Sequence, residues 1–173
     1  MSLKNIKLTP IIIAGLYRNS LLQKINPADP AEIIRIQEGE PALKYLGGNL
    51  RKTVFLVTHL QCQYLPEHHL QFLIRILSAC KMNLGDVAIL NYSKSHPDIT
   101  QLKKSLEPLR LILCGIEPAS LNIPFEFPQF KLQEFDHCVY LSIPSFDNLN
   151  QENEEGKLLK TRLWGCLKEM FEV

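Results

Sequence analysis

Four short apolar runs, separated by helical patterns, predict that this chain has an α/β fold. The runs are bounded by polar or turn residues and mostly do not alternate in polarity, which is typical of strands covered by helices on both faces. They are Val54–Val57, Val87–Leu90, Leu111–Gly115 and Val139–Ile143. Because strands and helices alternate along the chain, we expect a three-layer α/β/α sandwich with right-handed crossovers. Its sheet is predicted to be four-stranded and mostly parallel, in the order 2-1-3-4, with Leu111–Gly115 in the centre.

The first residues predict a helical arm ahead of this domain. Thr9-Pro10 supplies an N-cap and a proline at the first helical position. The arm comprises residues 1–25. Its apolar residues are spaced so that they share one face of the helix, and this face is a candidate partner-binding surface. It consists of Ile13, Leu16, Tyr17 and Leu21.

Residues 26–50 are interpreted as a linker followed by an ambiguous segment. Asn26–Pro30 contains two prolines, which oppose regular strand pairing. Residues 31–45 fit either an edge strand or a helical turn, and Gly47-Gly48 predicts a turn before the first core strand. The α/β domain is therefore expected to span residues 51–173.

Within the domain, apolar spacing predicts the helices between the strands. A helix starting at Pro66 has Leu70, Leu73, Ile74 and Leu77 on its buried face,. Leu102, Leu106 and Leu109 indicate a short helix broken by Pro108. The acidic stretch from Asp147 to Gly156 is expected to be a solvated loop leading into a last helix, Lys157–Phe171,.

The bulk composition excludes several classes of function. The formal net charge is +1, which gives no indication of strong attraction to nucleic acid or to an acidic membrane. No apolar stretch approaches the ~20 residues that span a bilayer, so we expect a cytoplasmic protein. The five cysteines are widely spaced and several lie in apolar runs, which favours buried reduced thiols over a disulfide framework or a metal site.

Histidines, cysteines and serines give no recognisable catalytic or metal-binding pattern. His68-His69 is expected to be exposed on one helical turn, without a third ligand at helical spacing,. His59, Cys62 and His96 can converge at the strand ends, but no orienting partner for Cys/His catalysis is evident. The sequence therefore predicts no catalytic residue, no metal and no cofactor.

Three segments nonetheless resemble the uracil-DNA glycosylase superfamily, in the order and spacing found there. Leu73–Asn91 resembles its segment in which a leucine-rich helix leads through a Leu-x-Asp-Val turn to a strand ending in Asn. Leu106–Gly115 and Ser142–Met170 resemble its later strand and its ending, respectively. The resemblance covers about Val54 to Phe171 and implies a glycosylase-like fold with a pocket beyond the carboxyl ends of the strands.

The residues that would perform glycosylase chemistry are missing from the matching positions. Thr58–Gln63 follows the first strand without the carboxylate or the glycines of the family. Ile143 stands where the family has a histidine that stabilises the departing base, and isoleucine forms no side-chain hydrogen bond. Asn91 alone matches a base-reading position, although a strand-end residue that caps the following loop is an equal alternative. The resemblance implies a degenerate pocket, formed by His59, Asn91, Gly115, Ile143 and Ser145.

Another group with this fold and without glycosylase residues is the psi subunit family of the bacterial DNA polymerase III clamp loader. Its ending resembles Ser142–Leu149 and Leu163–Leu167 here, and it also has an N-terminal arm, which docks on the clamp loader. The resemblance implies a non-catalytic DNA replication accessory protein that acts by protein–protein contacts, with clamp-loader or other replisome subunits as partners. Weak or absent DNA binding and no membrane association are expected. The alternative is a glycosylase-superfamily enzyme that acts on a nucleobase with altered catalytic residues.

Overall fold

The computed structural model describes residues 43–173. The predicted arm, residues 1–25, and most of the predicted linker lie outside the described residues. No helix within residues 43–173 has both the length and the apolar character needed to cross a membrane.

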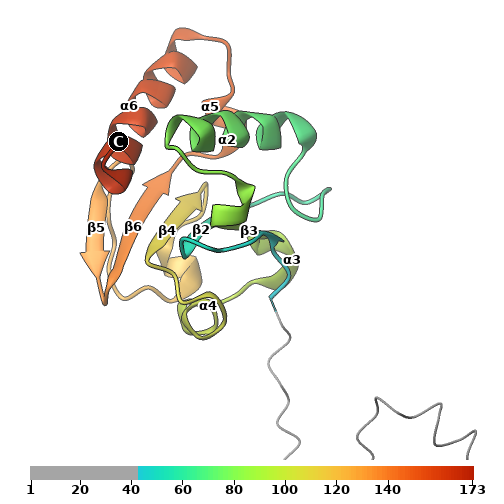
Figure 1. Cartoon of the computed structure of the whole chain (residues 1–173), viewed down its shortest axis with the longest axis vertical. Coiled ribbons are helices and arrows are strands. Elements are labelled where there is room, and N and C mark those ends of the chain that lie inside the picture. The colour runs from blue at the N-terminus through green and yellow to red at the C-terminus, as the bar shows by residue number, and fades with distance from the viewer. Residues whose placement is uncertain (1–42) are drawn as a thin grey trace, which may run out of the picture. The chain divides into compact units, whose positions relative to one another are not determined.

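The described residues form an α/β domain around one mixed sheet of six strands (Figure 1). The strand order is β1-β3-β2-β4-β6-β5. The strands are β1 Leu46–Gly47, β2 Thr53–Val57, β3 Val87–Asn91, β4 Arg110–Cys114, β5 Leu132–Phe135 and β6 Cys138–Ile143. The prediction of a four-stranded sheet is therefore wrong. The four apolar runs are the parallel strands β3, β2, β4 and β6 in the middle of the sheet, and an antiparallel strand is added at each edge.

One added strand, β5, forms a hairpin with β6. The two residues between them, Asp136 and His137, both have positive φ, at 48° and 57°. A two-residue turn with positive φ at both positions matches the right-handed twist of paired strands. Such turns usually contain glycine, and the segment here has none, which is why the sequence does not reveal the hairpin.

The other added strand, β1, pairs antiparallel with β3 through Leu46 and Gly47. Gly47 has a φ of +111°, and a Cβ there would lie 2.2 Å from the carbonyl oxygen of Val87. Only glycine fits this close approach of two backbones. The domain thus begins before residue 51, the boundary expected from sequence, and the Gly47-Gly48 pair belongs to the sheet edge.

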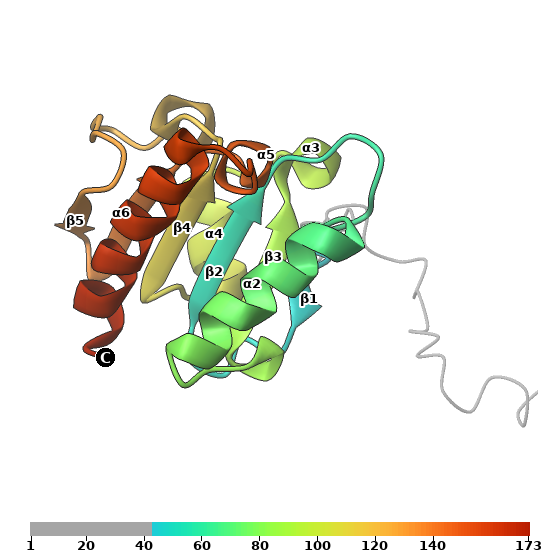
Figure 2. The same ribbon diagram turned by 90° about the horizontal axis from the view of Figure 1, so that it is seen from above.

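Helices cover both faces of the sheet (Figure 2). Those of the described residues are α2 Glu67–Ala79, α3 Tyr92–Ser95, α4 Ile99–Leu106, α5 Phe146–Leu149 and α6 Glu154–Phe171, with short 3-10 turns η1 Leu84–Asp86 and η2 Pro118–Leu121. Figure 2 shows α2 and α6 on one face and α4 on the other. The predicted short helix ends at Leu106, because Glu107 adopts a left-handed conformation, and Leu109 is left exposed.

The core follows from the alternation of side chains along each parallel strand. On β2, Phe55 and Val57 pack in the cluster that contains α2 and α6, whereas Val54 and Leu56 pack in the cluster that contains α4. Every residue of β2 and β3 is buried, so these strands read as continuous apolar runs. The parallel strands therefore end together at one edge of the sheet, where loops and short helices are free to form a site.

Candidate functional site

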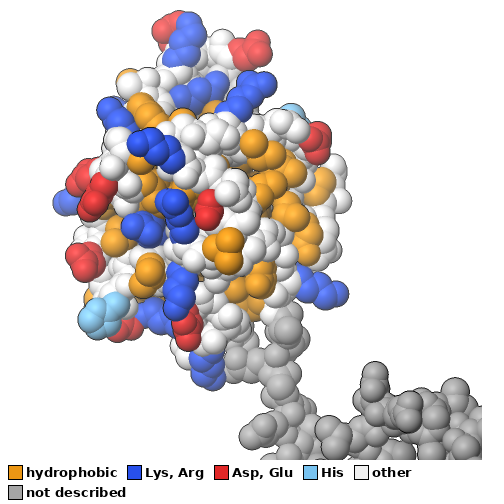
Figure 3. Space-filling model, in the orientation of Figure 1, with side chains coloured by type: hydrophobic (Ala, Val, Ile, Leu, Met, Phe, Trp, Pro, Cys, Tyr) orange, Lys and Arg blue, Asp and Glu red, His pale blue; other side chains and the backbone are white. Residues whose placement is uncertain are grey.

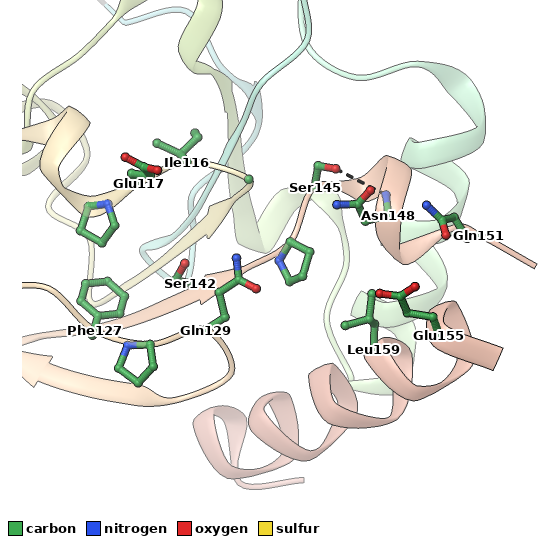
Figure 4. Close-up of a pocket in the computed structure, with 14 residues that line it drawn as sticks. Ile116, Glu117, Phe127, Gln129, Ser142, Ser145, Asn148, Gln151, Glu155 and Leu159 are labelled. Atoms are coloured by element: carbon green, nitrogen blue, oxygen red, sulfur yellow. Dashed lines mark hydrogen bonds between the residues drawn. The ribbon is translucent and has the colours of Figure 1, made fainter. Parts of the chain in front are cut away.

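A groove lies beyond the carboxyl ends of β4 and β6 (Figure 4). It has a volume of about 810 Å³ and is lined in part by α5 and the first turns of α6. The polar side chains that line it are Glu117, Gln129, Ser142, Ser145, Asn148, Gln151 and Glu155. Ile116, Phe127 and Leu159 supply apolar walls (Figure 4). No Lys or Arg is among the described residues that line the groove, so its chemistry suits a neutral or cationic polar ligand better than a phosphate.

Gly115 and Ser145, two of the predicted pocket residues, meet at the base of this groove. Gly115 has a φ of +68°, and a Cβ there would lie 3.0 Å from Cβ of Ser145. The backbone N–H of Gly115 donates to the carbonyl oxygen of Ile143 across 2.8 Å, which extends the pairing of β4 with β6. Ser145 Oγ accepts a hydrogen bond from the N–H of Asn148 at 3.4 Å and so caps α5,. Gly115 therefore shapes the groove through its backbone, and Ser145 does so through the hydroxyl that caps α5.

Asn91 is the residue that matches a base-reading position. Its side-chain amide forms four hydrogen bonds, all of them to the protein backbone. The residue is 2% exposed. Its Nδ2 donates to the carbonyl oxygens of His59, at 2.6 Å, and of Cys62, at 2.8 Å. Its Oδ1 accepts from the N–H groups of His59, at 3.1 Å, and of Ser93, at 3.2 Å. The amide thus fixes the loop after β2 and caps α3, which is the capping alternative considered from sequence.

Ile143 belongs to the core and not to the groove. Its side chain is 1% exposed and packs in the cluster that includes Val57, Phe146 and Leu163. The matching position in a glycosylase would need a polar side chain that reaches the ligand. Here the side chain points to the layer between the sheet and α6, so the apolar residue is required by packing.

His59 does not line the groove and lies beside another histidine, His69. The rings of His59 and His69 have centroids 5.6 Å apart. His69 is 1% exposed, on the first turn of α2, so the expectation that both residues of the His68-His69 pair are exposed is wrong. Burial, together with the charge of His68, lowers the pKa of His69, although the carboxylate of Asp147 opposes the shift. His96 lies apart, at the end of α3, where it packs on Tyr92.

The structure thus brings the five predicted pocket residues into different environments. Gly115 and Ser145 line the groove, Ile143 is in the core, and His59 is next to His69. Asn91 lines a smaller hollow of about 490 Å³ on the other side of the sheet edge, together with Gln63 and Lys94. The predicted partner-binding residues, Ile13, Leu16, Tyr17 and Leu21, lie outside the described residues.

Several groove residues were not singled out from the sequence. Glu117 lies three residues after the end of β4, and Glu155 lies in the first turn of α6. Their position after a strand end and at a helix start is the one available signal, since sites in parallel sheets form there. Phe127 and Gln129 lie in the irregular stretch before β5, and nothing in their spacing indicates that they face the groove.

The fold and this groove define an α/β protein with a ligand-sized, acidic site at the carboxyl edge of a mainly parallel sheet. A scan of the sequence against protein-family models finds no match, and a search of curated proteins likewise finds none.

Proposed function

We propose that this chain is a non-catalytic accessory protein of DNA replication with a glycosylase-like fold, resembling the psi subunits of the bacterial clamp loader and acting through protein–protein contacts. The main support for this proposal is the hydrogen bonding of the Asn91 side chain. Its amide makes four hydrogen bonds to the backbone of its own chain, which leaves no capacity to read a base edge. Ile143, the other matching position, is committed to core packing.

The surface supports contacts with proteins more than with nucleic acid. Figure 3 shows Lys and Arg side chains interspersed with Asp and Glu, without a continuous basic stripe on this face. Hydrophobic side chains gather on the right of the same view. Among the described residues, the exposed large hydrophobic side chains include Tyr45, just before β1, and Leu60, in the loop after β2, which are 38% and 78% exposed. Large contiguous apolar patches on a surface mark interaction sites, which supports a protein contact on this face.

The arm supplies a second contact in this proposal. Ile13, Leu16, Tyr17 and Leu21 bind the partner, a clamp-loader or other replisome subunit. We place the role in the cytoplasm, supported by the five cysteines, all of which are free thiols, as expected in a reducing compartment.

Affinity capture tests the partner. Full-length protein used as bait in extract of the source cells should retain clamp-loader subunits, and a version without residues 1–25 should not. Urea denaturation of both baits controls for folding: their midpoints should agree, because the α/β domain is expected to form without the arm. Capture that is independent of the arm, or free of replication proteins, would contradict the proposal.

The groove itself favours a second candidate, an enzyme of the glycosylase superfamily that acts on a nucleobase with altered residues. Its volume of about 810 Å³ is in the range of small-molecule sites, and Glu117 and Glu155 offer carboxylates that could serve as acid or base.

Two assays separate the candidates. The accessory protein should release no uracil from single- or double-stranded DNA. It should also bind a labelled oligonucleotide no more tightly than ~10⁻⁴ M near physiological salt, the weak end of non-specific binding. Micromolar binding with a steep salt dependence in fluorescence anisotropy, or turnover lost on Glu117→Gln, would favour the enzyme.

A further inference from the structure

Two histidines that lie ten residues apart and one aspartate from far along the chain come together at the loop that follows β2. His59 lies in that loop, His69 on α2 and Asp147 on α5. Each offers one ligand atom, and these atoms all lie within 4.8 Å of one another. No other described group of three His, Cys, Asp or Glu residues has this spacing. The cluster is separate from the groove and has no part in the proposed function.

The histidines carry buried nitrogens that nothing in the protein satisfies. His59 Nε2 and His69 Nδ1 are buried without a hydrogen-bond partner. Leaving a buried polar atom unpaired costs about 1–3 kcal/mol, and such atoms in a folded protein call for a ligand, ion or water as explanation. Each of these two nitrogens is therefore available to an ion or a water.

The spacing of His69 and Asp147 fits a shared ion better than a direct bond. His69 Nε2 and Asp147 Oδ1 are 3.5 Å apart, longer than the ~2.7–2.9 Å of a charge-assisted hydrogen bond. Two ligands of a tetrahedral Zn²⁺, each at about 2.0–2.2 Å from the metal, lie about 3.3–3.5 Å apart. The ligand atoms of the cluster lie at most 4.8 Å apart, so the widest separation must close by at most about 1.5 Å to reach that value.

Aromatic packing alone does not account for the arrangement. His69 does pack against Phe146, with ring centroids 5.8 Å apart, and against His68 at 4.0 Å. Packing, however, gives no role to a carboxylate facing a buried imidazole, nor to the unpaired nitrogens. Asp147 has a side chain 69% exposed, so an ion and its water can enter from solvent.

We propose that His59, His69 and Asp147 form a binding site for one divalent transition-metal ion, represented by Zn²⁺. Two imidazoles and one carboxylate are a donor set that zinc accepts, with a water in the fourth position. The bound ion ties the loop after β2 and the start of α2, which follow one another in the chain, to α5, which lies far along the sequence. It therefore stabilises the carboxyl edge of the sheet.

Zinc titration of the full-length, chelator-treated and reduced protein tests the site, with a chromophoric chelator as competitor. We expect one Zn²⁺ per chain and a rise in melting temperature, because the ion binds only the folded protein. Asp147→Asn should weaken zinc binding at least about tenfold, since even the loss of a second-shell partner costs 10–100-fold. Asp147 is exposed, so this variant should fold normally. His137→Ala, which removes an exposed histidine on the β5–β6 turn, is the matched control and should bind as the wild type does.

Cobalt substitution shows whether cysteine thiols, instead of the proposed ligands, bind the metal. The visible spectrum of the Co²⁺ form should show ligand-field bands of nitrogen and oxygen ligands, without the intense sulfur-to-metal charge-transfer band. That charge-transfer band, wild-type affinity in Asp147→Asn, or no zinc uptake by the wild type would each overturn the proposal.

Discussion

Replacing Asn91 by alanine should destabilise the domain because Asn91 fixes the loop after β2. The substitution removes four hydrogen bonds, which leaves the backbone groups of His59, Cys62 and Ser93 without their partner. A net value of about 0.5–1.5 kcal/mol per bond, reduced because water can reach part of the loop, gives a loss of about 2–4 kcal/mol. Urea denaturation at 25 °C measures this loss as a lower midpoint with an unchanged slope.

Asn91→Asp sharpens the test because it keeps the size and the acceptor oxygen. The carboxylate would face the carbonyl oxygens of His59 and Cys62, to which the amide now donates. We therefore expect a loss at least as large as that of Asn91→Ala. Asn148→Ala, on the exposed side of the groove, is the matched control and should stay within about 0.5 kcal/mol of the wild type. If Asn91→Ala also stays within that range, the four hydrogen bonds of Asn91 do not stabilise the loop. The side chain of Asn91 would then be a candidate ligand-binding group.

Three further substitutions or modifications have defined outcomes. Gly115→Ala should cost about 1–2 kcal/mol in chemical denaturation, because alanine in the left-handed conformation is strained; an unchanged midpoint would show that the turn relaxes. Ile143→His, which restores the histidine of glycosylases, should destabilise the protein by about 3 kcal/mol through burial of an unpaired polar ring and should release no uracil; measurable release would show that position 143 reaches a ligand. A thiol reagent such as DTNB should modify the partly exposed Cys62 in the native protein, whereas Cys114, whose thiol pKa is raised by complete burial, should react only after unfolding; equal rates would contradict the packing of β4.

The central strands were predictable from sequence because burial on both faces leaves a direct signature. Val87–Leu90 and Leu111–Cys114 are buried at every position, so polar residues are absent from them. The edge strands lack this signature. β5 reads Leu-Gln-Glu-Phe and is half exposed, and β1 has two residues. Both segments form strands because they pair with a neighbouring strand, β5 with β6 and β1 with β3. Their own composition does not indicate a strand.

The site was less predictable because its residues depend on where loops meet. Asn91 could be placed at a strand end, yet its role depends on the path of residues 59–62, which no local pattern encodes. The burial of His69 likewise depends on α5, which is more than 70 residues further along the chain. A histidine pair at a helix start is therefore indistinguishable, by sequence alone, from a pair of solvent-exposed rings.

The short antiparallel strands at both edges of the sheet also limit how the protein can associate. A long, flat edge offers unpaired backbone groups to any other chain and so promotes open-ended assembly. Here the parallel strands are shielded by β1, of two residues, and by β5, of four. A partner that recognises extended backbone would find little length to pair with. We therefore expect the protein to form complexes through side-chain contacts, which can be selective. The same short edge strands disfavour fibrous self-association through the sheet.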